Sequence, residues 1–304
     1  MLKIQNLTVQ INGQTILNQL NLQLTPGSVH ALMGPNGSGK STLAYTVLGH
    51  PNCQVTAGNL LFQGQDITDL TIDQRARRGI FLAFQYPQAV PGLSVFNFLH
   101  AAYNAFASDR LVVPVLDAQM LNASPLNSGG GAEQPNLARS IRTAPAESSA
   151  PVPDAEHAAL QPATPALTNQ ISVAAFKTIL DDAVVTLGLN PELLTRALND
   201  GFSGGEKKRL EMLQLYLLRP KLAIIDEIDS GLDVDALKTV TQVLQACRAR
   251  DPEFTLLLVT HYRRILDYLT PDFVHVIAAG QLAATGTAAL AQQIDQAGYA
   301  QYLP

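Results

Sequence analysis

Apolar and polar residues follow two patterns along this chain of 304 residues. They alternate over residues 2–11 and 16–24, which is typical of strands, and short apolar runs bounded by turn residues predict buried strands. Apolar residues at helical spacing, ended by glycine or proline, predict helices. The predicted strands are residues 2–11, 16–24, 29–33, 58–62, 80–84, 222–226, 254–260 and 273–277. The predicted helices are residues 41–48, 71–78, 173–187, 206–218, 236–249 and 263–269.

The predicted strands and helices alternate on both sides of a segment of different composition, residues 109–170. Such alternation favours an α/β fold, and the length alone allows one large or two modest domains. The segment contains 8 of the 18 prolines, three consecutive glycines and no Phe or Tyr. Because it cannot bury enough apolar area to offset its ordering entropy, we expect a flexible insertion. Composition leaves two uses open: a solvated spacer, or an arm that binds a partner or regulates.

Charge and hydropathy exclude several classes of protein. The 20 Lys and Arg against 25 Asp and Glu leave a net charge of -5, so we expect no nucleic-acid partner. No apolar run approaches the roughly 20 residues of a spanning helix, so we expect no membrane insertion. The first residues enter a strand pattern without a leader-like segment, which favours a cytoplasmic protein. Cys53 and Cys247 lack neighbours at metal-ligand spacing and are interpreted as small apolar residues that do not ligate iron.

The octapeptide GPNGSGKS at residues 34–41 matches the phosphate-binding loop pattern, between a predicted strand and a predicted helix. Its glycines let backbone N–H groups surround phosphates, and the following helix directs its positive end at them. We expect Lys40 to reach the β and γ phosphates and Ser41 to ligate Mg²⁺. A glycine-rich turn without a ligand is the alternative, and the strand–loop–helix context argues against it. The predicted nucleotide-binding residues here are Gly34, Pro35, Asn36, Gly37, Ser38, Gly39, Lys40, Ser41 and Thr42.

Two carboxylates, Asp226 and Glu227, follow an apolar run at residues 222–225. They are predicted to lie at the carboxyl end of a buried strand, where open parallel sheets bind ligands. Asp226 would hold Mg²⁺, and Glu227 would act as general base for a water that attacks the γ-phosphate. An acidic pair after a strand is as often a helix start as a catalytic site. The phosphate-binding loop gives this pair its functional interpretation.

Three further elements narrow the prediction. In the segment FSGGE at residues 202–206, Ser203 can cap the following helix, whose first turn offers a second anion site. Two such helix ends suggest either two anions or a second copy of the chain. Residues 230–233, SGLD, follow the acidic strand, and His261 ends another strand. Alone, His261 would more often be a structural histidine, and Gln85 a surface amide.

Taken together, these motifs resemble those of the ATP-binding-cassette (ABC) ATPases, in the same order along the chain. The motifs are the phosphate loop at 34–41, the glutamine loop at Gln85, the signature at 203–206, the acidic strand at Asp226 and Glu227, the loop at 230–233 and the switch histidine His261. The resemblance implies a single domain over residues 1–304. Its fold would be that of a P-loop NTPase, with a RecA-like core, an antiparallel β subdomain and a helical subdomain. The helical subdomain would occupy residues 93–200, interrupted by residues 109–170.

The same resemblance implies an ATPase that uses ATP and Mg²⁺. Its catalytic residues would be Glu227, His261 and Lys40, with Ser41, Gln85 and Asp226 at the metal. In this family two cassettes pair head to tail when ATP is bound, and the signature of one closes on the ATP of the other. The resemblance implies that Ser203 and Gly205 act on the second cassette's nucleotide. The signature residues that it implies to bind nucleotide are Ser203, Gly204, Gly205 and Glu206.

Several segments are similar to the SufC group of this family, the ATPase subunits of the Suf iron-sulfur cluster assembly machinery. They are residues 29–40, 83–87, 201–209, 226–238, 259–268 and 271–276. This similarity implies SufB-like and SufD-like scaffold subunits as partners, with docking around residues 86–98. Core packing is the alternative for the aromatic residues of that stretch. Two other functions stay open: a transporter's nucleotide-binding subunit, and a non-catalytic nucleotide-sensing regulator, against which the intact motifs argue.

The chain departs from the family pattern in two places. Transporter cassettes commonly stack an aromatic residue on adenine, but the corresponding position, near Ile11, is aliphatic. Phosphate and magnesium contacts are therefore expected to dominate nucleotide affinity. The second departure is the segment at residues 109–170, which lies between Gln85 and the signature.

Overall fold

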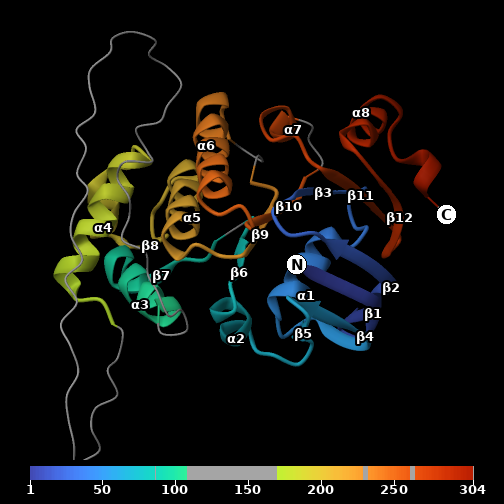
Figure 1. The fold of residues 1–304 in the computed structure, drawn as a ribbon, viewed down its shortest axis with the longest axis horizontal. Coiled ribbons are helices and arrows are strands. Elements are labelled where there is room, and N and C mark those ends of the chain that lie inside the picture. Colours follow the sequence, from blue (N-terminus) through green and yellow to red (C-terminus); the bar gives the residue numbers. More distant parts are fainter. Residues whose placement is uncertain (86, 108–169, 229–231, 261–263, 304) are drawn as a thin grey trace, which may run out of the picture. The chain divides into compact units, whose positions relative to one another are not determined.

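The computed structural model describes residues 1–85, 87–107, 170–228, 232–260 and 264–303 (Figure 1). By their contacts, these described residues form one unit. Several features of the sequence-based interpretation lie outside the described residues. They are the insertion up to residue 169, Tyr86 of the docking stretch, Ser230 and Gly231 of the loop at 230–233, and His261.

A six-stranded sheet forms the centre of the described unit, with strand order β12-β11-β3-β10-β9-β6. Five strands run parallel, and β12 is antiparallel to β11. Every residue of β3, β6, β9 and β10 is buried, which is why these strands read as continuous apolar runs. The strands are β3 (Val29–Met33), β6 (Ile80–Ala83), β9 (Leu222–Asp226), β10 (Thr255–Val259), β11 (Phe273–Ala278) and β12 (Gln281–Gly286).

A second, four-stranded antiparallel sheet has the order β2-β1-β4-β5. A turn at Asn12 and Gly13, both with positive φ (50° and 78°), joins its first two strands, because such turns match the twist of a hairpin. Its inner face shares one apolar core with helix α1 (Lys40–Leu48) and with β6, β9 and β10. The strands are β1 (Leu2–Ile11), β2 (Gln14–Leu24), β4 (Gln54–Phe62) and β5 (Gln65–Asp66).

Helices cover both faces of the central sheet. Figure 1 shows α5 and α6 on one side, and α1 with the four-stranded sheet on the other. The remaining helices are α2 (Ile72–Arg77), α3 (Val95–Ala107), α4 (Val173–Thr186), α5 (Gly204–Leu218), α6 (Val234–Arg250), α7 (Arg264–Tyr268) and α8 (Ala288–Ala297). Short elements complete the described chain: η1 (Pro191–Leu194), η2 (Ala300–Tyr302) and the strand pair β7 (Val90–Ser94) and β8 (Ala197–Leu198). No helix within the described ranges is long and apolar enough to cross a membrane.

The α/β fold agrees with the sequence-based prediction, and the differences lie at element boundaries and at the edges. The helix predicted from Glu206 begins at Gly204, because Ser203 caps it. The strand predicted to include Phe84 ends at Ala83, because the Phe84 backbone bonds to a side chain of α5 instead of the sheet. The prediction did not include α3, β12 and α8. The region assigned to a helical subdomain contains α3, α4 and η1.

Candidate functional site

The carboxyl ends of neighbouring parallel strands bring the predicted site residues together. Val259 of β10 is paired with Leu32 of β3 on one side and with Asp226 of β9 on the other. The phosphate-binding loop follows β3, and Gln85 follows β6, so both lie at this edge of the sheet. A pocket of about 470 Å³ opens here. It is lined by Ile16, Asn36, Gly37, Gly39, Lys40, Ser41, Thr42, Gln85 and Glu227.

The loop before α1 needs glycine at its first position. A Cβ on Gly34 would lie 2.2 Å from the carbonyl oxygen of Ile277 and 2.8 Å from Oγ of Ser38. At the other end, Gly39 is the N-cap of α1 with φ 105°, and no side chain caps the helix. The first N–H groups of α1 are therefore left for an anion in the pocket, as the helix dipole favours.

Lys40 is buried at the base of this loop. Its Nζ donates to the carbonyl oxygens of Gly34 (2.8 Å) and Pro35 (3.0 Å). Burial lowers the pKa of Lys40, and the carboxylates of Glu227 and Asp226 oppose that shift. The loop carbonyl oxygens thus hold the Lys40 ammonium in place, and phosphate oxygens of a bound nucleotide could replace them as its hydrogen-bond acceptors.

Asp226 has the environment of a metal ligand. Its side chain is 1% exposed, Oδ1 accepts a hydrogen bond from Ser41 Oγ (3.3 Å), and the buried Oδ2 has no hydrogen-bond partner. Burial raises the pKa of Asp226 to about 6, with Ser41 and Lys40 acting in the opposite direction. A buried carboxylate oxygen without a donor fits a hard cation, and Mg²⁺ takes oxygen ligands. Asp226 and Ser41 therefore fit the predicted metal.

Glu227 and Gln85 meet across the pocket. Nε2 of Gln85 donates to Oε2 of Glu227 at 2.5 Å, although the two residues are 142 positions apart. Glu227 has φ 49°, in the left-handed region, and its N–H donates to the carbonyl oxygen of Val259. Non-glycine residues in this region are strained and often occur at functional sites. The turn that follows β9 thus directs the Glu227 carboxylate toward Gln85 and the phosphate-binding loop.

The signature segment caps α5 away from this pocket. Ser203 Oγ accepts from the N–H of Glu206 (3.3 Å), and Glu206 Oε2 accepts from the N–H of Ser203 (2.7 Å), which is a capping box. Arg196 donates to Glu206 Oε1 (3.2 Å) and lies over the ring of Phe202. The Ser203 hydrogen bonds are the main cause of the lowered pKa of Glu206. Ser203 and Gly204 are exposed, and the residues that line the described pocket do not include 203–206.

The structure gives local structural roles to two other residues that the sequence analysis singled out. Asp233, from the loop at 230–233, caps α6 by accepting from the N–H of Ala236 (2.7 Å). The ring of Phe96, from the predicted docking stretch, packs edge-on against Phe176, with 5.6 Å between centroids. For Phe96, core packing is therefore the better interpretation. Phe84, just before that stretch, is 36% exposed beside the glutamine loop.

The sequence reasoning missed three residues near the site. Ile16, near the start of β2, lines the pocket, whereas the adenine-contact expectation concerned Ile11. Alternation in β2 placed Ile16 on a strand but gave no sign of the pocket. Lys208 and Glu211 of α5 bond to the backbone of Phe84 and Gln85. Two long charged side chains in one buried helix face are a signal that could have indicated them.

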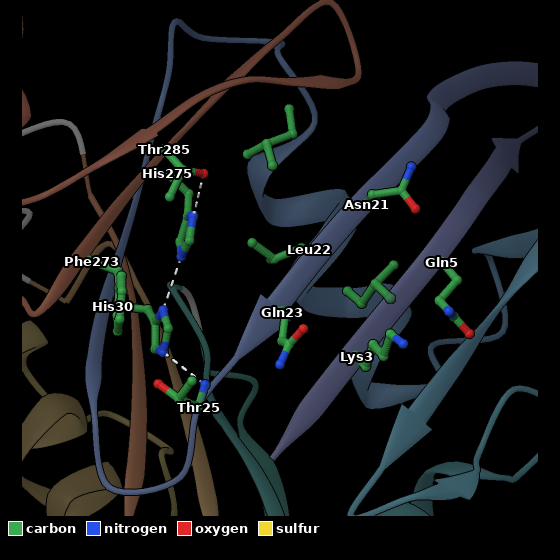
Figure 2. Close-up of a pocket in the computed structure, with 12 residues that line it drawn as sticks. Lys3, Gln5, Asn21, Leu22, Gln23, Thr25, His30, Phe273, His275 and Thr285 are labelled. Atoms are coloured by element: carbon green, nitrogen blue, oxygen red, sulfur yellow. Dashed lines mark hydrogen bonds between the residues drawn. The ribbon is translucent and has the colours of Figure 1, made fainter.

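A second pocket, of about 400 Å³, contains a pair of histidines (Figure 2). The Thr25 N–H donates to His30 Nε2 (3.2 Å), so His30 carries its proton on Nδ1 and donates it to His275 Nε2 (2.9 Å). His275 Nδ1 then donates to Thr285 Oγ1 (3.0 Å). Figure 2 shows this chain on one side of the pocket, facing Leu22 and Gln23. In this arrangement each ring accepts at Nε2 and donates at Nδ1, so both imidazoles are neutral and all four ring nitrogens are hydrogen-bonded.

Comparison with known proteins identifies the family. The family model described as ABC transporter matches residues 17–230, more than two thirds of the chain. The chain belongs to the ABC transporter family. It is accordingly an ATP-binding subunit of the ABC type, a cassette that binds nucleotide.

Relatives of the cassette are named as ATP-binding proteins of ABC transporters or as ATP-dependent transporters. It is 41% identical over 299 residues to a probable ABC transporter ATP-binding protein of Streptococcus pyogenes serotype M3, covering 98% of the cassette and 93% of that protein. It is 37% identical over 300 residues to the probable ATP-dependent transporter ycf16 of Antithamnion sp., covering 98% and 96%.

Solved structures share its fold. One is the ATP-binding subunit of an ABC transporter, with a TM-score of 0.64 at 20% identity, covering 98% of the cassette and 93% of that chain. Another is a dimeric cassette in a post-hydrolysis state bound to ADP and Pi, with a TM-score of 0.63 at 16% identity, covering 95% and 99%. At these identities the likeness establishes the fold.

Proposed function

We propose that this cassette hydrolyses ATP with Mg²⁺ in the pocket beside the phosphate-binding loop. The observation that carries the proposal is the convergence of three groups at one sheet edge. They are the Lys40 ammonium in its loop, the Ser41–Asp226 pair with its unpartnered carboxylate oxygen, and the Gln85–Glu227 hydrogen bond. A phosphate-binding loop, a metal ligand and a positioned carboxylate are the parts that phosphoryl transfer to water requires.

Each side chain has a defined task in the proposed reaction. Glu227, oriented by Gln85, accepts the proton of a water whose oxygen attacks the γ-phosphorus while the bond to the β-phosphate oxygen breaks, giving ADP and phosphate. Lys40 and the first N–H groups of α1 bind the phosphate oxygens. Bound Mg²⁺, held by Ser41 and Asp226, would neutralise charge that develops on those oxygens. His261 belongs to the proposal through its position in the sequence motif.

The proposal includes a second copy of the cassette that pairs with the first when ATP is bound. The exposed signature segment supports it. The capping box uses the N–H groups of Ser203 and Glu206 and leaves those of Gly204 and Gly205, at the positive end of α5, for an anion that lies outside this chain's own pocket. Ser203, Gly204, Gly205 and Glu206 would then face the nucleotide of the partner copy. The helical subdomain at residues 93–200, which directly precedes the signature in the sequence, would lie at the contact between the two copies.

For the partner, we propose soluble scaffold subunits of the SufB and SufD kind, with the cassette driving their conformational change during iron-sulfur cluster assembly in the cytoplasm. The segments similar to SufC support this choice. The names of the relatives favour the second candidate, the nucleotide-binding subunit of a membrane transporter. Copurification of the full chain from its native cells tests both. Soluble scaffold subunits should be recovered, and recovery of a transmembrane permease would contradict the scaffold proposal.

Replacement of Glu227 by Gln tests the hydrolase. Because Gln keeps the shape but cannot take the proton, we expect turnover to fall by about 10² or more while ATP affinity changes little. Phosphate release and binding of a fluorescent ATP analogue measure the two quantities. Glu253→Gln, an exposed carboxylate in the loop before β10, is the matched control. Normal turnover in Glu227→Gln would overturn the assigned role. If Glu227→Gln keeps normal turnover while the chain still copurifies with scaffold subunits, the role of Glu227 as general base fails and the proposed partner stands.

A further inference from the structure

Helix α5 carries a buried ion pair five and eight residues beyond the signature serine. Nζ of Lys208 lies 3.6 Å from Oε2 of Glu211, and the two side chains are only 7% and 4% exposed. Burial raises the pKa of Glu211 to about 7, against the opposing effect of Lys208. Charges this far from water are costly to bury and give little stability, so such a pair calls for a local reason.

The reason lies in the backbone that follows β6. The N–H of Phe84 donates to Glu211 Oε1 (2.7 Å), and Lys208 Nζ donates to the carbonyl oxygens of Phe84 (2.8 Å) and Gln85 (3.2 Å). Ladder pairing of β6 with β9 ends at Ala83, opposite Ile225. The two charged side chains therefore replace the missing strand partners at the point where the chain leaves the sheet.

This arrangement links the signature helix to the hydrolytic carboxylate. The side chain of Gln85, whose backbone Lys208 holds, donates to Glu227. Lys208 and Glu211 lie about 8 and 12 Å along the axis of α5 from Ser203, at 1.5 Å per residue. A rotation of α5 would carry the pair, and with it the glutamine loop, in one movement.

We propose that Lys208 and Glu211 are positioning residues that clamp the glutamine-loop backbone to α5, and so set Gln85 against Glu227 according to the position of the signature. The inference rests on the proposed ATP hydrolysis for its catalytic part. Its structural part, the clamp on Phe84 and Gln85, is independent of any activity. The alternative is that the pair only fills buried space.

The test replaces both residues in the full chain by an apolar residue of similar length, Lys208→Met with Glu211→Met. Replacing a buried pair by packed apolar residues is often neutral for stability, so the double variant should fold, as thermal melting checks. The matched control is Lys221→Met with Asp251→Asn. It removes a partly exposed lysine–aspartate pair (3.0 Å) at the opposite end of β9 and leaves the net charge unchanged. Glu211→Gln, which keeps an oxygen for the Phe84 N–H, is the conservative variant.

Two measurements test the two parts of the proposal separately: amide hydrogen exchange tests the backbone contact, and kcat tests its effect on ATP hydrolysis. Amide hydrogen exchange at Phe84 should accelerate by about tenfold in the double Met variant and stay unchanged in the control and in Glu211→Gln. The kcat for ATP should fall by about tenfold or more with Kd for ATP within about threefold, since misplacement of a positioned group affects the reacting geometry. Glu211→Gln should recover most of the kcat.

Unchanged exchange at Phe84 would overturn the clamp. Faster exchange with an unchanged kcat would overturn the link to Glu227 and leave a structural pair. If the unmodified chain releases no phosphate from ATP, the proposed function fails, and the exchange measurement still decides whether the clamp exists.

Discussion

The buried histidine pair should contribute to the free energy of unfolding a term that is lost in mild acid. Burial lowers the pKa of His30 to about 3, with the neighbouring His275 adding to the shift and Asp272 opposing it. Burial also lowers the pKa of His275 to about 4. In the hydrogen-bonded chain of Figure 2 each ring is neutral. Protonation of both rings would place two positively charged imidazolium groups against each other, with 2.9 Å between His30 Nδ1 and His275 Nε2.

The sign of the effect follows from proton binding in the two states. Between pH 6.5 and the folded pKa values the unfolded chain binds protons that the folded chain does not, so stability rises with pH in this window. The contribution is complete above pH 6.5 and is lost as the pH falls towards 4 and 3. Between pH 6.5 and pH 5 each histidine lowers the free energy of unfolding by about 2 kcal/mol, at 1.36 kcal/mol for each pH unit, and the pair lowers it by about 4 kcal/mol.

Two buried carboxyl groups act in the opposite direction. Burial raises the pKa of Asp226 to about 6 and that of Glu211 to about 7, so both favour the folded state as the pH falls from 7 towards 4. The pH dependence of the unmodified chain is therefore a difference of opposing terms. A comparison of variants isolates the histidine contribution, because the carboxyl terms are common to both proteins.

Urea unfolding at pH 7.5 and pH 5 provides the assay, with His30→Gln combined with His275→Gln as the perturbation. The loss of unfolding free energy between the two pH values should be smaller in the double variant by about 4 kcal/mol. His50→Gln, at the end of α1, is the control and should behave as the unmodified chain, because the buried pair is intact in it. An equal loss in the double variant would refute the reasoning.

Three further outcomes are expected. Gly34→Ala should abolish binding of ATP in a fluorescence assay, because its Cβ would lie 2.2 Å from the Ile277 carbonyl oxygen; retained binding would contradict the required close approach. Arg75→Met should lower the unfolding free energy in urea by about 3 kcal/mol, since Arg75 is buried and donates to the carbonyl oxygens of Thr46 (2.7 Å) and Val47 (3.0 Å) at the end of α1. A chain purified without oxygen should hold no stoichiometric iron, as Cys247 is buried with its pKa raised to about 11; retained iron and sulfide would contradict this.

Sequence reasoning recovered the features that depend on neighbouring residues. The strands at 29–33 and 222–226 have the predicted bounds, because a continuous apolar run between turn residues defines a buried strand. The α/β class followed from their alternation with helices. Elements at the edges were missed. Strand β12 is half-exposed and poor in β-branched residues, so neither its pattern nor its composition separates it from a loop.

For the site, the sequence by itself determined which functional groups are available, and the tertiary structure decided how they are arranged. The phosphate-binding loop and the capping box at Ser203 are short-range features, set by glycine geometry and by hydrogen bonds three residues apart. The bonds from Gln85 to Glu227 and from Phe84 to Glu211 join residues 142 and 127 positions apart, and the histidines of Figure 2 are 245 apart. Such contacts arise only when the strand order and helix packing bring the segments together, because no local pattern encodes which distant backbone a buried charge will meet.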